Sequence, residues 1–342
     1  MNIDQLLTPF WEGREVFDET IMLASKNGGQ AKAKLFYTPE KILSVKSTDL
    51  KTEYIEGKDW EYCNGEIVML DDSTMPFMRA EELHFYEKSN NDCFGAKDGG
   101  YILYKTEGYF HKRQLAVTYI HNDTVDFGTR KLNGERLRRT KELLKKGENI
   151  KMCFYGDSIT AGCDGSKMTG IEPFMPGWPE LFALKLEKTF NSKIEIVNTA
   201  VEGKRTDWGL ECVEERLSVY KPDLAVVAFG MNDGTEKVSA DDFRNNIKMI
   251  KENVLSQNEN TEFIFISTTL PNPESVFDGY QREYYDELVK CTGDNDTIVD
   301  MTSIHSALLE RKAFVDMTGN NINHPNDFLI RIYAQALIEL FC

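Results

Sequence analysis

The segment FYGDSITAG, residues 154–162, contains a serine that could act as a nucleophile. Ser158 follows an apolar run and precedes residues with small side chains. Gly, Asp and Ser are also common in turns, so the tripeptide by itself is typical of a loop. A nucleophilic role would require a general base and donors for an oxyanion elsewhere in the chain.

Three other positions could supply those groups. His324, in NNINHPNDF, could be the base. Gly203, in NTAVEGKRTDW, would let the backbone N–H approach a substrate without a Cβ in the way. Asn232, in GMND, has a side-chain amide that could donate to an oxyanion, together with the Ser158 N–H. The carboxylate of Glu202, beside Gly203, would repel the negative charge of an oxyanion. We therefore expect the Glu202 side chain to face away or to contact a substrate hydroxyl or Lys204.

The elements that would position these residues are predicted after residue 150. Near-continuous apolar runs indicate strands at 150–155, 193–200, 223–229, 262–268 and 297–301, with amphipathic helices between them. This alternation predicts an α/β domain with a doubly wound parallel sheet covered on both faces. Ligands of such folds bind beyond the carboxyl ends of the strands, where Ser158, Gly203 and Asn232 all fall.

The first half has a different pattern. Short β-type runs separated by turn residues continue to about residue 128 and predict an all-β sandwich of the jelly-roll type. The basic run at 130–146 favours the solvated face of a connecting helix. We therefore predict an N-terminal domain at 1–130, a linker helix at 131–149 and a hydrolase-like domain at 150–342.

The composition of the chain disfavours several classes of function. The net charge of −16 disfavours binding to nucleic acid or to an anionic membrane surface. The seven cysteines are scattered without a C-x-x-C pair, which indicates reduced thiols and no zinc site. The start of the chain has no pattern of a secretory signal, so we expect a cytoplasmic protein. Composition leaves the oligomeric state open, a homo-oligomer included.

Residues 150–342 resemble the SGNH, or GDSL, hydrolase family. The resemblance rests on YGDSIT with Ser158, the segment of Gly203, GMND with Asn232, and NHP with His324. It implies a serine hydrolase that acts on esters and needs no metal or organic cofactor. The order of the two halves is similar to that of two-domain esterases that remove O-acetyl groups from plant polysaccharides or their oligosaccharides.

The motif that contains His324 departs from the family pattern. The family has Asp-x-x-His, in which the Asp orients the base, whereas this chain has Asn321 at that position. An Asp-to-Asn change in a serine-protease triad costs about 10⁴-fold in rate. The resemblance therefore favours a Ser–His dyad in which a backbone carbonyl holds the histidine, with Asp316 and Asp327 as alternative third members.

Further residues near the strand ends could contact a substrate. Trp178 and Trp208 could stack on sugar rings, although core packing explains each equally well. Asn272 and Gln281 could form hydrogen bonds to substrate hydroxyls, or they could only stabilise the loops in which they lie. Asp157 is interpreted as a local backbone cap.

The sequence thus predicts a serine esterase, with an O-acetylated carbohydrate or oligosaccharide as the expected substrate. One alternative is a lipid esterase, lysophospholipase or thioesterase on the same scaffold, which would need an apolar groove for an acyl chain. Another is a carbohydrate-binding protein that has lost activity through Asn321.

Overall fold

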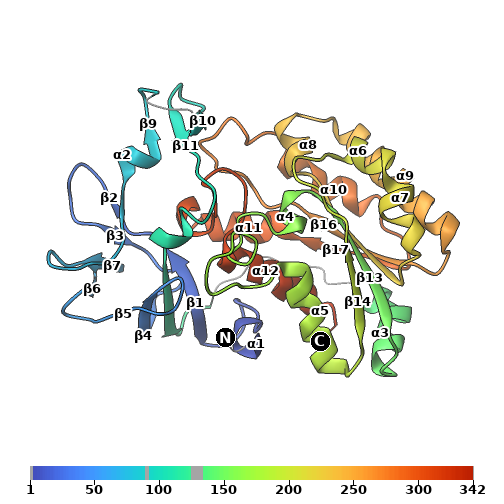
Figure 1. Cartoon of the computed structure of the whole chain (residues 1–342), viewed down its shortest axis with the longest axis horizontal. Coiled ribbons are helices and arrows are strands. Elements are labelled where there is room, and N and C mark those ends of the chain that lie inside the picture. The colour runs from blue at the N-terminus through green and yellow to red at the C-terminus, as the bar shows by residue number, and fades with distance from the viewer. Residues whose placement is uncertain (1–2, 89–91, 125–133, 342) are drawn as a thin grey trace.

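A computed structural model describes residues 3–88, 92–124 and 134–341 of the 342-residue chain. Its second half is built on a five-stranded parallel sheet with the order β14-β13-β15-β16-β17 (Figure 1). The strands are β13 (Ile150–Gly156), β14 (Ile194–Asn198), β15 (Leu224–Ala228), β16 (Glu262–Ser267) and β17 (Asp296–Asp300). All five pair in parallel, which confirms the predicted α/β class.

Helices cover both faces of this sheet because successive side chains of each strand point to opposite faces. On one face, Met152 and Phe154 pack in a cluster with α5 (Trp178–Phe190), α11 (Met301–Leu309) and α12 (Asp327–Ile338). On the other face, Cys153 and Tyr155 pack with α7 (Val213–Arg216), α9 (Ala240–Gln257) and α10 (Tyr284–Val289). The remaining helices of this half are α4 (Ser158–Ala161), α6 (Thr206–Glu211) and α8 (Met231–Thr235).

The first half is β-rich, as predicted, and its described residues form three small sheets. The first is antiparallel, with the order β1 (Glu15–Ile21), β12 (Leu115–His121), β4 (Pro39–Ser47) and β5 (Glu53–Tyr54). The second comprises β6 (Trp60–Cys63), β7 (Glu66–Met69), β3 (Lys32–Ala33), β2 (Ala24–Ser25) and β8 (Met78–Arg79). The third comprises β10 (Cys93–Gly95), β11 (Tyr101–Leu103) and β9 (His84–Phe85). The described residues of this half also form two short α-helices, α1 (Ile3–Leu6) and α2 (Ala80–Leu83).

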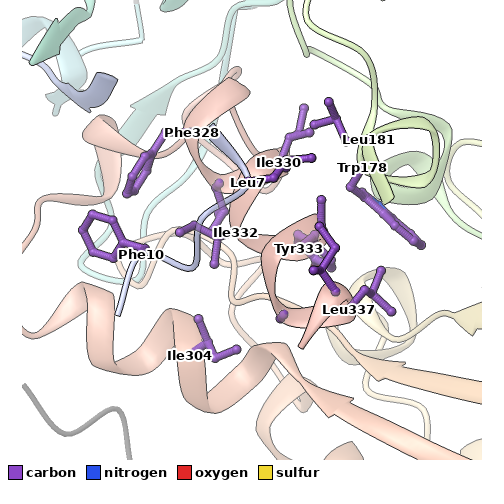
Figure 2. Close-up of a cluster of buried hydrophobic side chains, with 14 of the residues drawn as sticks. Leu7, Phe10, Trp178, Leu181, Ile304, Phe328, Ile330, Ile332, Tyr333 and Leu337 are labelled. Atoms are coloured by element: carbon purple, nitrogen blue, oxygen red, sulfur yellow. The ribbon is translucent and has the colours of Figure 1, made fainter. Parts of the chain in front are cut away.

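The two halves share buried side chains. One hydrophobic cluster contains residues of the first half, such as Leu7 and Phe10, together with residues of α12. The ring of Phe10 lies 5.2 Å from that of Phe328 in an edge-to-face arrangement (Figure 2). Helix α3 (Arg138–Lys145) lies within the predicted linker, of which residues 131–133 fall outside the described residues. The predicted domain boundaries stay a prediction.

A buried ion pair also connects the halves. Lys312, after α11, donates to the carboxylate of Glu19 on β1 and to the Thr20 carbonyl at 2.9 Å. The side chains of Lys312 and Glu19 are both 0% exposed. Tyr119 on β12 donates to the second oxygen of the same carboxylate at 2.5 Å. The Glu19 charge is thus compensated inside the protein, as a buried charge requires.

Among the described residues, the structure contains no helix that is both long and apolar enough to cross a membrane.

Candidate active site

Ser158 lies directly beyond the carboxyl end of β13 and is the first residue of α4. Asp157 caps this helix, as interpreted from the sequence, because its Oδ1 accepts from the Ile159 N–H at 3.0 Å. The preceding Gly156 allows close strand packing, since a Cβ there would lie 2.2 Å from the Ala228 carbonyl oxygen. The serine is 1% exposed, so its position is set by packing on all sides.

His324 is held by the loop that precedes α12. The side-chain oxygen of Asn320 accepts from the backbone N–H groups of Ile322, Asn323 and His324 at 2.9–3.1 Å. The His324 carbonyl in turn accepts from the Gly319 N–H at 2.9 Å. These hydrogen bonds fix the conformation of the loop, although the loop itself forms no long helix or strand. It places Nε2 of His324 2.9 Å from Oγ of Ser158.

The other ring nitrogen of His324 contacts Asp164. Nδ1 lies 2.6 Å from Oδ2 of Asp164, and both side chains are at most 7% exposed. An ionised carboxylate can only accept hydrogen bonds, so Nδ1 carries the proton and Nε2 is left to accept from the serine hydroxyl. The three side chains therefore form the chain Ser158–His324–Asp164 that a triad requires.

Two backbone features bring Asp164 to the histidine. Asp164 has φ +62°, in the left-handed region that Asp tolerates better than most residues. Gly319 makes room for it, because a Cβ at residue 319 would lie 2.7 Å from the Asp164 Cβ and 2.8 Å from its carbonyl oxygen. The loop after α4 and the loop before α12 thus approach each other more closely than they could if residue 319 carried a side chain.

The predicted partners of the histidine were wrong. Asn321 adopts φ +65°, and its side-chain amide donates to the Leu103 carbonyl at 3.1 Å. Asp316 accepts from the Met22 N–H at 2.7 Å, and Asp327 accepts from the Ser166 N–H at 2.8 Å. The expected dyad with a backbone carbonyl is also wrong, since the Asp164 carboxylate occupies that position.

Two of the three predicted oxyanion donors, Gly203 and Asn232, line one cavity of about 450 Å³. Gly203 has φ +72°, a conformation that favours glycine and explains its presence there. The Asn232 amide donates one hydrogen to the Lys204 carbonyl at 3.0 Å, which leaves its second hydrogen for another acceptor. Asp233 joins the two loops by accepting from the Thr206 N–H at 3.0 Å.

Three of the four residues that could contact a substrate are buried, which fits the alternatives of core packing and a loop role. Trp178 is fully buried, and its ring stacks on that of Tyr333 with the centroids 5.7 Å apart. Both side chains belong to the hydrophobic cluster drawn in Figure 2. The Asn272 amide donates to the Asn321 carbonyl at 3.0 Å, and Gln281 donates to the Met231 carbonyl at 3.0 Å, both inside the protein. Trp208 does line the cavity of Gly203 and Asn232, so its contact with a substrate stays a prediction.

Burial changes the acidity of the groups around the serine. It raises the pKa of Asp157 to about 7, although the Ile159 N–H partly offsets the effect. It raises the pKa of Asp233 in the same way, against the hydrogen bonds from Thr206. Burial also raises the pKa of the Cys163 thiol to about 12, with Glu202 and Asp164 adding to the effect. Cys163 is therefore a protonated thiol at neutral pH and a poor nucleophile.

Within the described parts of the chain, no group of three or more His, Cys, Asp or Glu side chains is arranged to hold a metal ion. The six described cysteines form no disulfide bonds with one another, and Cys342 lies outside the described residues.

The geometry and the sequence comparison agree on the class of protein. Residues 154–328 match the GDSL-like lipase/acylhydrolase family, and the chain belongs to that family. The family match supports the predicted class of carboxylic ester hydrolase. No curated protein sequence matches it.

The chain is similar to two solved structures among others. One is a two-domain esterase, CEX, active on acetylated mannans and co-crystallised with mannopentaose. Its TM-score is 0.50 at 20% identity, covering 60% of this chain and 52% of the esterase, so the match spans about half of that protein. Another is a catalytic mutant of Axe2, an acetylxylan esterase from Geobacillus stearothermophilus, with a TM-score of 0.47 at 17% identity, covering 58% of this chain and 96% of that one.

Proposed function

We propose that the protein is a serine esterase that removes acetyl groups from carbohydrates through an acyl-enzyme on Ser158. The observation that carries this proposal is the hydrogen-bonded chain Ser158–His324–Asp164, with distances of 2.9 and 2.6 Å. In the first step His324 takes the proton of the serine hydroxyl while Oγ attacks the ester carbonyl. The Asp164 carboxylate stabilises the imidazolium that forms.

The tetrahedral intermediate places a negative charge on the former carbonyl oxygen. The backbone N–H groups of Ser158 and Gly203 and the free amide hydrogen of Asn232 are the donors proposed for it. The imidazolium of His324 then returns its proton to the leaving alcohol. Water, activated by the same histidine, hydrolyses the acyl-enzyme and restores the serine.

The cavity beside the donors supports a polar alcohol as the leaving group. Besides Gly203, Asn232 and two aromatic rings, its lining consists of charged and hydroxyl side chains: Lys204, Arg205, Asp207, Glu211, Thr235 and Glu236. Such a wall can hydrogen-bond to the hydroxyl groups of a sugar, whereas the chain of a lipid would need an apolar groove. The activity of CEX on acetylated mannans, a structure of the same fold, makes acetylated mannan fragments a natural first substrate to try.

The test is hydrolysis of 4-nitrophenyl acetate, butyrate and octanoate, followed by acetate release from acetylated manno- and xylo-oligosaccharides. We expect wild type to prefer acetate and Ser158→Ala to lose activity on every ester. The matched control is Ser256→Ala, on the exposed surface of α9, which should retain wild-type rates. A preference for octanoate would instead support the lipid esterase or thioesterase alternative. Equal rates for wild type and Ser158→Ala would reject the serine mechanism.

A further inference from the structure

The third small sheet of the first half, here called the arm, consists of β9, β10 and β11 and lies against the catalytic half (Figure 1). It docks on the segment that follows β16. The Lys97 N–H donates to the Glu274 carbonyl at 2.8 Å, and the Val276 N–H donates to the Gly95 carbonyl at 3.1 Å. An antiparallel bridge between Ala96 and Ser275 lies between these two bonds. The arm thus contacts the catalytic half through paired backbone groups.

Side chains strengthen this contact. His84 on the arm lies 3.2 Å from a carboxylate oxygen of Glu274, and Lys97 pairs with Asp278. The ring of Phe94 lies 4.8 Å from that of Phe277, edge to face. Phe277 lines the cavity of Gly203 and Asn232, so the arm packs directly behind one wall of that cavity.

Tyr104 directly follows β11, the last strand of the arm, beside the loop of His324. The ring of Tyr104 lies 4.9 Å from that of Phe94. The carbonyl of the preceding Leu103 accepts from the side chain of Asn321, three residues before the histidine. Burial raises the pKa of Tyr104, and the charges of Asp164 and Glu202 raise it further. Tyr104 packs against the buried cluster of Ala96, Ile102 and Ile322, the last of which lies two residues before His324, and its side chain stays partly exposed.

The chemistry of acyl transfer decides which part of a substrate would meet this residue. The histidine returns its proton to the leaving alcohol, so the alcohol must lie on the histidine side of the serine. Tyr104 lies beside the loop that carries the histidine, because it packs on the cluster that includes Ile322 and the carbonyl of the preceding Leu103 binds Asn321. A tyrosine offers both an apolar ring face and a hydroxyl group, which together suit a sugar.

We propose that Tyr104 contacts the sugar that carries the acetyl group, so that the first half of the chain supplies a residue to the substrate site. This inference rests on the esterase function proposed above. It gives the arm a role in substrate selection and assigns no chemical step to Tyr104.

The test is the binding of acetylated manno-oligosaccharides, by isothermal titration calorimetry, to the full-length chain with Ser158→Ala, so that no substrate is consumed. Adding Tyr104→Ala should weaken binding about tenfold, and Tyr104→Phe, which loses only the hydroxyl, about threefold. Tyr86→Ala is the matched control, because Tyr86 lies just after β9 on the same arm but is 69% exposed. That control should bind within twofold of the parent.

The outcomes separate this inference from the esterase function. With wild-type Ser158, Tyr104→Ala should lower kcat/KM for the oligosaccharide about tenfold but change 4-nitrophenyl acetate hydrolysis less than threefold. Unchanged oligosaccharide binding, an equal loss on both esters, or a parent that binds no oligosaccharide would each overturn the inference. If Tyr104→Ala lowers the Tm by more than a few degrees, the oligosaccharide binding of Tyr104→Phe decides whether the inference holds. The esterase function is judged separately, by whether Ser158→Ala abolishes hydrolysis of 4-nitrophenyl acetate.

Discussion

Replacing Asp164 with Asn tests the part of the site that departs most from the family pattern. The carboxylate lies 2.6 Å from Nδ1 of His324, with both side chains buried. The variant preserves shape but removes the negative charge that stabilises the imidazolium. The amide can also turn its NH₂ group toward Nδ1, which would force the proton onto Nε2 and prevent that nitrogen from accepting the serine proton.

The expected loss follows from these two effects. In a serine protease the same substitution lowers kcat about 10⁴-fold. A buried pair with a short charge-assisted hydrogen bond should behave similarly, so we expect a loss of about 10³- to 10⁴-fold. At about 1.4 kcal/mol for each factor of ten, this corresponds to about 4–5.5 kcal/mol of transition-state stabilisation.

The assay is kcat for 4-nitrophenyl acetate, with the Tm measured on the same samples to confirm folding. Asp327→Asn is the matched control, because it neutralises another buried aspartate near the site and keeps an oxygen to accept from the Ser166 N–H. It should stay within threefold of wild type. The triad would be refuted if Asp164→Asn kept more than a tenth of wild-type kcat, and a selective loss in Asp327→Asn would move the acid to residue 327.

Three further predictions concern the oxyanion donors, the buried ion pair and the acidity of the site. Asn232→Ala should lower kcat about 10²- to 10³-fold with little change in KM, because its amide is expected to act in the transition state. A loss confined to KM, in steady-state kinetics, would contradict that role. Lys312→Met leaves the Glu19 carboxylate buried without its cation and should lower the free energy of unfolding by about 3–5 kcal/mol in urea titrations. Adding Glu19→Gln should restore part of the loss, and a cost below about 1 kcal/mol would show that the pair is not isolated from water. Burial raises the pKa of Asp157 from 3.8 to about 7, so between about pH 4 and pH 7 the folded state keeps a proton that the unfolded state has lost. The contribution of this residue to stability therefore falls as pH rises through that window, by about 1.4 kcal/mol per pH unit. Asp157→Asn should show a smaller decrease in unfolding free energy from pH 5 to pH 7 than wild type, and equal decreases would rule out the raised pKa.

The sheet could be predicted from the sequence because its physical signal is local. Each predicted strand of the second half overlaps an observed one, for example 223–229 with Leu224–Ala228. A strand buried on both faces needs a run of apolar residues, and such a run is visible without knowledge of its neighbours. The rule that ligands bind beyond the carboxyl ends of strands then located Ser158, Gly203 and Asn232.

Asp164 could not be found in this way because its role depends on contacts distant in sequence. It lies six residues after the nucleophile, in a loop rich in small residues that reads as a turn. Only its left-handed backbone and the close approach of Gly319, 155 positions later, bring it to the histidine. The one weak signal was an aspartate next to glycine just after the nucleophile, a pair that favours unusual backbone angles.

Residue type alone also failed to separate core from surface near the site. Trp178 follows the serine segment much as a sugar-binding residue could, yet its indole packs inside the cluster around α12 (Figure 2). Its N–H is satisfied by the Ile159 carbonyl at 3.1 Å, which removes the usual reason for a tryptophan to face water. The role proposed for Tyr104 could not be predicted from the sequence, because nothing in a β-strand pattern shows which sheet will dock beside the loop of His324.

The most direct test of the account is to trap the acyl-enzyme analogue. The wild-type protein is incubated with a fluorophosphonate, and the labelled peptide is identified by mass spectrometry. We predict a single adduct on Ser158, absent from Ser158→Ala and formed much more slowly in Asp164→Asn. An adduct on another residue, or labelling of Asp164→Asn at the wild-type rate, would contradict the triad of Ser158, His324 and Asp164.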